Sequence, residues 1–294
     1  RSAVAGFEGA EIRFDKNGSV QLATGAVHQG QGHATTFSQI LNDRLGVDPG
    51  DVHYVSGDTD MVEFGEGSYG SRSAALAGSA IHMASQKILS KATAIANHLM
   101  QVDDAAFEAG VFASRKTNAT VTLKDVARAA WTPGKVPPDM EPGLAAAAAY
   151  NNPKENFPNG CHVCEVEIDE ELGTLELTRY VVVDDVGTVI NPLLLKGQIM
   201  GGVAQGVGQL LLEDIRFDAD SGQLQTGSFM DYAMPRAHHF PHMEIASHPT
   251  ATRTNPLGVK GAGEAGCVGA MPAVGNAIVD ALSVYGITEM AMPA

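Results

Sequence analysis

A short loop near the end of the chain places one carboxylate among glycines. Its residues are Gly258-Val259-Lys260-Gly261-Ala262-Gly263-Glu264-Ala265-Gly266. Glycines permit positive φ and the close approach of a bulky ligand, and Lys260 is the only charged side chain near Glu264 in the sequence. Burial beside a cofactor would raise the pKa of such a carboxylate and suit it to act as a general base. The alternative is that Glu264 caps the helix that follows.

The same loop contains the spacing Gly261-x-Gly263-x-x-Gly266, which also occurs in dinucleotide-binding turns. Such a turn follows a strand directly and belongs to a βαβ unit. The residues before it, 251–257, are polar and include a proline, which is typical of a loop. Asp280 lies at about the ~20-residue distance of the ribose-binding acid, but inside an expected helix. We therefore do not predict a Rossmann nucleotide site here.

A second glycine-rich segment leads into a helix expected from about Thr35. It contains Gln29, Gly30, Gln31, Gly32 and His33. Glycines at a helix N-terminus leave backbone N–H groups open, and the helix dipole favours an anion there. The two glutamines add uncharged donors and acceptors, which suits a phosphate or a polar heterocycle. An uninvolved turn and a metal held by His28 and His33 are the alternatives.

A third loop, of glycine and serine, also runs directly into an expected helix. It reads Gly65-Glu66-Gly67-Ser68-Tyr69-Gly70-Ser71-Arg72-Ser73. Ser73 is the predicted N-cap of that helix, and the chain lacks the G-x-S-x-G elbow of a serine nucleophile. Three such loops, together with the polar Gln198 on a glycine-rich helix, predict a large anionic cofactor held mainly by backbone donors.

The elements that must position these loops predict an α+β fold of mixed sheets with packed helices. Asn17-Gly18 between two alternating segments predicts a hairpin over 10–23. Helices are expected at 35–45, 73–100, from Thr122-x-x-Asp125, at 193–212 and at 273–285. Further strands are expected at 52–56, 161–168, 174–184, within 214–225 and at 243–247. The Pro- and Ala-rich residues 131–158 are expected to connect two lobes, 1–130 and 159–294, with a turn of helix at 145–149.

The helix expected at 193–212 is unusual because it carries five glycines. They are Gly197, Gly201, Gly202, Gly206 and Gly208. Each costs a helix roughly 0.5–1 kcal/mol relative to alanine. Close contact with another backbone or with a flat ligand would explain them, and so would bulky neighbours in the core.

Composition narrows the class of protein. The 294 residues are 44% hydrophobic, enough for one large or two smaller domains, and the net charge of −15 argues against a nucleic-acid partner. Three cysteines are too few for a disulfide framework, and the strand pattern around Cys161 and Cys164 favours ordinary strand residues over a metal or redox pair. No signal peptide or apolar run of the ~20 residues of a membrane span is visible, so we expect a cytoplasmic protein. A start at Arg1 without methionine is expected of an excised domain or a processed subunit.

Four motifs occur in order over nearly the whole chain. They are Gln29-Gly30-Gln31-Gly32-His33, Gly67-Ser68-Tyr69-Gly70-Ser71-Arg72-Ser73, Gly197-Gln198-Ile199-x-Gly201-Gly202 and Lys260-Gly261-x-Gly263-Glu264. Each is weak alone. Together they resemble the xanthine oxidase family of molybdenum hydroxylases, which includes aldehyde oxidases and the aerobic carbon monoxide dehydrogenase. The whole chain, 1–294, is similar to the second, C-terminal molybdopterin-binding domain of the large subunit.

The resemblance implies roles for individual residues. Glu264 would be the active-site glutamate that takes up a proton when water serves as the oxygen donor. Gln31 and Gln198 would hydrogen-bond the pterin and its dithiolene. No side chain would bind molybdenum directly, because the dithiolene holds the metal.

The other residues of the motifs would surround the cofactor. Gly30, Gly32 and His33 would meet its pyrophosphate. The remaining cofactor-binding residues implied by the motifs are Gln29, Gly70, Ser71, Arg72, Ser73, Lys260 and Gly263.

The resemblance also implies an activity and partners. The enzyme would hydroxylate an aldehyde, an N-heterocycle or a small carbon compound, with molybdopterin as its cytosine dinucleotide. Iron–sulfur clusters and FAD would lie on other domains or subunits. The first molybdopterin-binding domain, which supplies the other wall of the site, is missing from this chain, so we expect an exposed apolar and glycine-lined docking face. The alternative function is a non-catalytic, cofactor-free binding or assembly module of the same fold.

Overall fold

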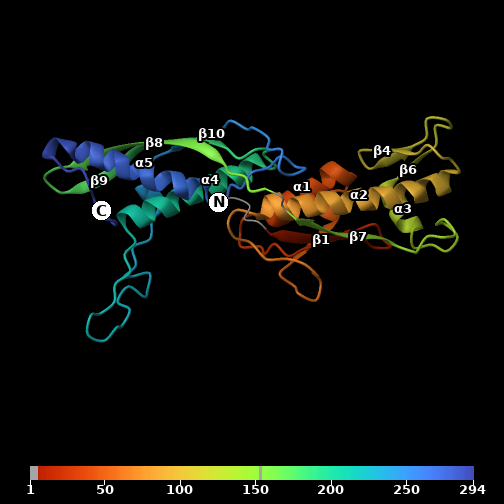
Figure 1. Ribbon diagram of the computed structural model, residues 1–294, viewed down its shortest axis with the longest axis horizontal. Coiled ribbons are helices and arrows are strands. Elements are labelled where there is room, and N and C mark those ends of the chain that lie inside the picture. The colour runs from red at the N-terminus through yellow and green to blue at the C-terminus, as the bar shows by residue number, and fades with distance from the viewer. Residues whose placement is uncertain (1–5, 152–153) are drawn as a thin grey trace. The chain divides into compact units, whose positions relative to one another are not determined.

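The structure is a computed structural model that describes residues 6–151 and 154–294. The described chain forms two compact units (Figure 1). Unit 1 runs to Asn156 and also includes Thr252–Val259, and unit 2 comprises Phe157–Ala251 and Lys260–Ala294. The mixed sheets and packed helices confirm the predicted fold class.

Unit 1 is built on a four-stranded sheet in the order β3-β2-β1-β7. Strands β1 (Phe7–Phe14) and β2 (Val20–Thr24) form the hairpin predicted from Asn17-Gly18. The long helix α2 (Ser73–Met100) packs on β1 and β7 and has the predicted bounds. Its buried face is mostly alanine, glycine and serine, so the helix can approach the sheet closely.

A βαβ crossover positions the first glycine-rich motif. Strand β3 (Val52–Ser56) runs parallel to β2, and helix α1 (His33–Leu45) connects them before a short 3₁₀ turn, η1 (Pro49–Asp51). Helix α1 ends at Gly46, whose φ of 63° is left-handed, which confirms the predicted end. The motif therefore lies at the carboxyl end of a parallel strand, where open α/β sheets commonly bind ligands.

Strand β7 (Leu144–Asn151) corrects the expectation of a connection with a helical turn at 145–149. Five consecutive alanines favour a helix by propensity, but this segment pairs with all eight residues of β1. Leu144 and Ala148 are buried in this strand, whereas Ala145, Ala147 and Ala149 are exposed, as expected of a strand with one face covered by α2. Long-range pairing therefore outweighs the local preference.

The rest of unit 1 is a small sheet beside α2. It consists of β4 (Ala106–Glu108), β5 (Val111–Ala113) and β6 (Thr120–Thr122), followed by α3 (Leu123–Ala129). The hydroxyl of Thr122 accepts a hydrogen bond from the Asp125 N–H at 3.1 Å, which confirms the predicted cap of α3.

Unit 2 contains a three-stranded sheet in the order β10-β9-β8. Strands β8 (Asn159–Asp169) and β9 (Thr174–Asp185) are antiparallel, and β10 (Met243–Ser247) is parallel to β9. Helix α4 (Pro192–Leu211) lies in the crossover between β9 and β10, and α5 (Ala265–Leu282) packs against β8 and α4. Buried Tyr180, Val182, Val203 and Val274 contribute to the core. The 3₁₀ turns η2 (Ala237–His239) and η3 (Ser283–Tyr285) complete the unit.

Two expectations for unit 2 were wrong. The final helix begins at Ala265 and continues through Pro272, although proline commonly ends or kinks a helix. Contacts with α4 and β8 along its length stabilise it. The strands expected within 214–225 reduce to one isolated bridge between Phe217 and Leu224.

Helix α5 with η3 is also longer and more apolar than expected. Residues Ala265–Tyr285 are long and apolar enough to cross a membrane by length and composition, and most of their apolar stretch is not buried inside this chain. The buried positions Gly266, Ala270, Val274 and Ile278 recur every fourth residue and form the face toward α4 and β8. Packing within unit 2 therefore explains one apolar face of α5 and leaves the other exposed.

The glycines of α4 serve two different surfaces. A Cβ on Gly202 would lie 2.9 Å from the Cys267 nitrogen, and one on Gly206 would lie 2.9 Å from the Cys267 carbonyl oxygen. Among the described residues, by contrast, nothing lies within 4 Å of a Cβ built on Gly197 or Gly201. Close backbone contact with α5 explains the first pair, and the second pair lies on an open face of α4.

This difference gives a stability prediction. Gly266→Ala should destabilise the chain by about 1–3 kcal/mol, because its Cβ would overlap backbone atoms of Ile199 and Val203. Gly201→Ala should be neutral or stabilise by up to about 1 kcal/mol, since alanine favours a helix. Denaturant unfolding of the two variants measures the difference. Equal losses would contradict the two-surface assignment.

Candidate cofactor site

The first motif forms an open turn between β2 and α1. Gly30 and Gly32 have φ values of 99° and 80°, which a residue with a side chain rarely adopts. Gly32 occupies the N-cap of α1, and in the described chain no side chain caps this helix. The first N–H groups of α1 are therefore available to a ligand, and they favour an anion.

Gln31 holds this turn in shape. Its Oε1 accepts a hydrogen bond from the Gln29 N–H at 2.5 Å, and its Nε2 donates to the Val27 carbonyl at 3.1 Å. The side chain is thus engaged within the loop. In this conformation Gln31 fixes the backbone that a ligand would meet.

His33, the first residue of α1, is buried and stacks on Phe37, with ring centroids 4.7 Å apart. Burial lowers the pKa of His33 to about 4, helped by the charge of His28 and opposed by a backbone hydrogen bond at Ala26. The ring is therefore neutral at pH 7. Its buried Nδ1 has no hydrogen-bond partner among the described residues, so it could serve a ligand.

The second motif lies against the first. The Ser68 hydroxyl donates to the Val27 carbonyl at 2.8 Å and shares a 2.9 Å hydrogen bond with the Ser73 hydroxyl. Gly25 and Gly65 touch through their backbones, because a Cβ on Gly25 would lie 2.5 Å from the Gly65 Cα. Unit 1 therefore brings the first two motifs into one surface.

The structure corrects the predicted N-cap of α2. Ser73 is the first helical residue, Arg72 occupies the cap position, and no side chain of the described chain caps the helix. The preceding Ser71 has a φ of 55° and Gly70 has the same value. A non-glycine residue with this φ is uncommon and often belongs to a functional turn.

The Arg72 guanidinium is fully buried beneath this loop. It lies 3.3 Å from Glu8 and 3.2 Å from Glu66, and it donates to the Phe7 and Gly67 carbonyls at 2.7 and 3.0 Å. Burial raises the pKa of Glu8, against the lowering effects of backbone N–H groups and of Arg72. Arg72 thus anchors the loop to β1. Its side chain does not reach the surface that a cofactor would contact.

In unit 2, Lys260 anchors the loop of the fourth motif to the end of β9. Its Nζ lies 2.5 Å from Asp185, and its N–H donates to the Val186 carbonyl at 2.8 Å. Burial would raise the pKa of Asp185, but hydrogen bonds from Lys260, Thr250 and Gly187 and the charge of Lys260 lower it to about 2. The ion pair therefore persists over the physiological pH range.

Glu264 occupies the N-cap position of α5, but its side chain makes no capping hydrogen bond among the described residues. Glu264 therefore stands at the position of a capping residue, but its carboxylate does not cap the helix. Glu264 and Gly263 are exposed, so this chain alone does not bury the carboxylate. Burial would have to come from a cofactor or from another part of the protein.

Gln198 lies close to this loop within unit 2. The backbone of Ile199 and Gly202 contacts Gly266 in the first turn of α5. Gln198 is half-buried, and Gly197 and Gly201 beside it are exposed. Unit 2 thus brings the third and fourth motifs together, as unit 1 does the first and second.

The three glycine-rich loops share one feature. They lead into α1, α2 and α5, the helices that begin without a side-chain cap in the described chain. Helices α3 and α4 are capped by Thr122 and Asn191.

The described residues contain no group of three or more His, Cys, Asp and Glu side chains that could hold a metal ion.

Sequence reasoning missed the residues that support these loops. Glu8 is a carboxylate on an otherwise apolar, buried stretch of β1, and Asp185 ends β9. A charged residue within a buried strand face was the available signal for Glu8. No local sequence pattern indicates that Glu8 pairs with Arg72 or Asp185 with Lys260. The partners are far apart in the sequence and meet only in the folded chain.

The fold is α+β, and three glycine-rich loops lead into helices without a side-chain cap in the described chain. Comparison with known proteins agrees: the family model for the molybdopterin cofactor-binding domain matches residues 2–241. The chain belongs to this family, and the predicted resemblance is confirmed.

Relatives of established name extend the comparison. The chain is 37% identical to the carbon monoxide dehydrogenase large chain of Hydrogenophaga pseudoflava, over 98% of this chain and 36% of that protein. It is 37% identical to the nicotine 6-hydroxylase large subunit of Paenarthrobacter nicotinovorans, over 97% of this chain and 35% of that subunit. The chain thus spans about a third of the length of these relatives.

Solved structures are similar as well. CO dehydrogenase from Oligotropha carboxidovorans matches with a TM-score of 0.90 and 36% identity, over 98% of this chain and 36% of that chain. Quinoline 2-oxidoreductase from Pseudomonas putida 86 matches with a TM-score of 0.86 and 35% identity, over 95% of this chain and 36% of that chain.

Proposed function

We propose that this chain, over residues 1–294, is the C-terminal molybdopterin-binding part of the large subunit of a molybdenum hydroxylase. The observation that carries the proposal is that each of the three glycine-rich loops leads into an uncapped helix, in a chain of this family. Open N–H groups at helix N-termini suit the phosphates of a dinucleotide cofactor. The buried, unpartnered Nδ1 of His33 also fits a ligand at this surface.

Residues of unit 1 would bind and shape the phosphate side. The N–H groups that follow Gly30 and Gly32 would donate to the pyrophosphate, and neutral His33, stacked on Phe37, would hold the start of α1 beside it. Gly70, Ser71 and Ser73 would line the cofactor. Gln29, Gln31 and Arg72 would act mainly by holding the loops, because Gln31 and Arg72 already make hydrogen bonds within the chain.

Residues of unit 2 would serve the reaction. When bound, the molybdenum–pterin group supplies the redox centre that oxidises the substrate. Gln198, beside exposed Gly197 and Gly201, would hydrogen-bond the pterin. Glu264 would accept a proton at its carboxylate as water is used, and Gly263 and the Lys260–Asp185 pair would position its loop.

The proposal also includes a cofactor form, a substrate class and partners. We infer the cytosine dinucleotide form, with iron–sulfur clusters and FAD on other domains or subunits in the cytoplasm. The substrate class is an aldehyde, an N-heterocycle or a small carbon compound, in line with relatives named for carbon monoxide, nicotine and quinoline. The first molybdopterin-binding domain would complete the site against the open face of α4.

Metal and pterin analysis of the complete enzyme tests the proposal. We expect about one molybdenum and one pterin per large subunit, whereas a cofactor-free assembly module would contain neither. Gln198→Ala should lower cofactor retention, because an unpaired polar group costs about 1–3 kcal/mol. Gln205→Ala is the matched control, since it is an exposed glutamine on the same helix. Equal cofactor content in the two variants would remove Gln198 from the site.

A further inference from the structure

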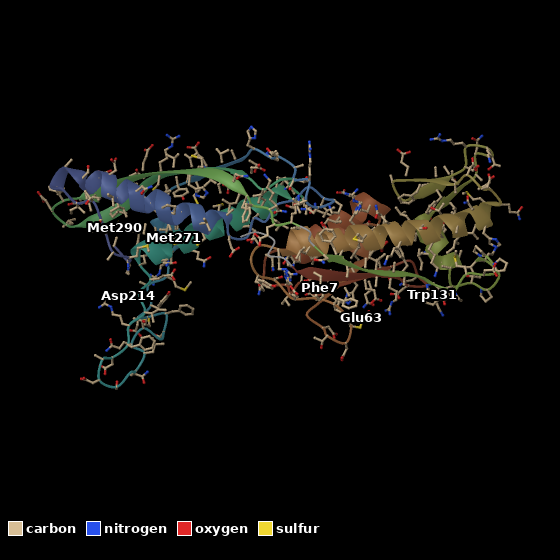
Figure 2. The ribbon with its side chains drawn as sticks, viewed as in Figure 1. Phe7, Glu63, Trp131, Asp214, Met271 and Met290 are labelled. Atoms are coloured by element: carbon tan, nitrogen blue, oxygen red, sulfur yellow. The ribbon has the colours of Figure 1, made fainter. Side chains whose placement is uncertain are left out.

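An arm leaves unit 2 after α4 and returns before η2. We define the arm as residues 213–236 (Figures 1 and 2, with Asp214 labelled near its base). Its two ends are tied together, because the Tyr232 hydroxyl donates to the Glu213 carboxylate at 2.6 Å. Pro235 and Glu213 both lie against Gly208 of α4, where no side chain would fit. The arm thus has a fixed base.

The arm also has internal order. The Asp218 N–H donates to the Gln223 carbonyl and the Gln225 N–H to the Arg216 carbonyl, each at 2.8 Å. These hydrogen bonds flank the bridge between Phe217 and Leu224. A second turn follows, in which the Tyr232 N–H donates to the Ser228 carbonyl at 2.8 Å. Since the backbone is held in shape, the arm can present its side chains in a defined arrangement.

Large apolar side chains of the arm are nevertheless exposed. The exposed fractions are Ile215 63%, Phe217 63%, Leu224 39%, Phe229 82%, Met230 93% and Met234 47%. A cluster of this kind on an ordered segment usually marks an interface. Phe and Met are enriched in the buried centres of interfaces. Covering these side chains would remove their apolar surface from water, which is favourable.

We propose that the arm docks into an apolar socket in the remainder of the same large-subunit polypeptide. This inference rests on the proposed function. In two relatives, the part that matches this whole chain makes up 36% of a longer polypeptide. A partner on the same polypeptide has a high effective concentration, so an arm can bind it without a large independent affinity.

Charge argues for this occupant over a second copy of the chain. The arm carries five acidic residues (Glu213, Asp214, Asp218, Asp220 and Asp231) and two arginines (Arg216 and Arg236). The whole chain has a net charge of −15, so two copies meeting through their arms would bring like charges together. The socket should therefore be apolar, with lysine or arginine at its rim.

Thiol labelling of the full-length large subunit tests the arm. Met230→Cys and Leu172→Cys place single thiols at positions that are 93% and 73% exposed in this chain. Leu172 lies in the β8–β9 turn, outside the arm, and is the matched control. We expect maleimide to label the thiol at position 230 at least 10-fold more slowly than that at position 172, read by peptide mass spectrometry so that the native cysteines do not interfere. Hydrogen exchange of the unmodified subunit should show slower exchange at 226–231 than in the β8–β9 turn.

Each outcome bears on the proposal. Equal labelling and exchange of arm and turn in the full-length subunit would overturn it. Protection that appears only as protein concentration rises would assign the arm to a second copy, and protection that needs another subunit would assign it to that subunit. Both results would also overturn it. Molybdenum measured on the same sample tests the proposed function separately, because a protected arm without molybdenum would refute only the hydroxylase.

Discussion

Glu264→Gln in the complete enzyme should abolish turnover while leaving cofactor content nearly unchanged. The amide keeps the shape of the side chain but cannot accept a proton. A general base contributes roughly 10²–10⁴-fold to the rate, and the loss is larger if the reaction has no other route for the proton. Steady-state kinetics at saturating substrate, together with molybdenum analysis, measure both quantities. The acidic limb of the pH–rate profile should also disappear if protonation of this carboxylate causes it.

At position 264 a loss of activity can be separated from a loss of stability. Glu264 is exposed, and glutamine has the same size and shape, so the substitution should change the stability of α5 little. Glu244→Gln is the matched control, because Glu244 is an exposed acid on β10 of the same unit that pairs with Arg179 at 3.1 Å. Near-normal activity of Glu264→Gln would show that Glu264 is not the general base and only occupies the start of α5.

Local patterns predicted the elements whose ends are set by nearby residues. The Asn17-Gly18 turn identified the β1–β2 hairpin, and a long run of helix-favouring residues identified both ends of α2. Gly46 ended α1 because a left-handed residue is needed there. In each case the physical cause lies within a few residues of the feature, so the sequence is sufficient.

Other features depend on partners that are distant in the chain. The run of alanines in β7 predicts a helix from the local sequence, and only the pairing with β1 makes it a strand. Helix α5 passes through Pro272 because its packing against α4 and β8 offsets the lost hydrogen bond. A single sequence does not contain these pairings in any local pattern.

The candidate site shows the same division. The glycine loops and Glu264 could be identified because glycine spacing and a lone carboxylate are local properties. The roles of Gln31 and Arg72 could not, since their side chains turn into the loops and hold them. A residue of a motif can therefore either bind a ligand or hold the backbone that binds it. The side-chain contacts in the structure are needed to tell these two roles apart.

Arg72→Met should produce the largest loss of stability in unit 1. The substitution would leave the Glu8 carboxylate buried without its cation, and the Phe7 and Gly67 carbonyls without their donors. Breaking a buried ion pair by removing one partner typically costs about 3–5 kcal/mol. Denaturant unfolding measures the loss. In the complete enzyme, cofactor retention should fall with it, because the 65–73 loop would lose its anchor to β1.

A double-mutant cycle separates the pair from the rest of the loop. Glu8→Gln combined with Arg72→Met should be less destabilising than the sum of the two single changes, because the double variant contains no buried unpaired charge. The control Arg128→Met should cost less than about 1 kcal/mol, since the Arg128–Asp125 pair is exposed. Additive effects in the cycle would show that Arg72 acts through its carbonyl contacts alone.

The pH dependence of stability gives an independent check on this pair. Burial raises the pKa of Glu8 above its ordinary value of 4.5, and loss of Arg72 should raise it further. A group with a raised folded-state pKa contributes stability below its unfolded-state pKa, and this contribution is lost as the pH rises through the folded-state value. The Arg72→Met variant should therefore regain stability relative to the wild type as the pH falls toward 4.5, where Glu8 becomes neutral. A deficit that stays constant between pH 7 and 4.5 would mean that the buried charge of Glu8 is not what destabilises the variant.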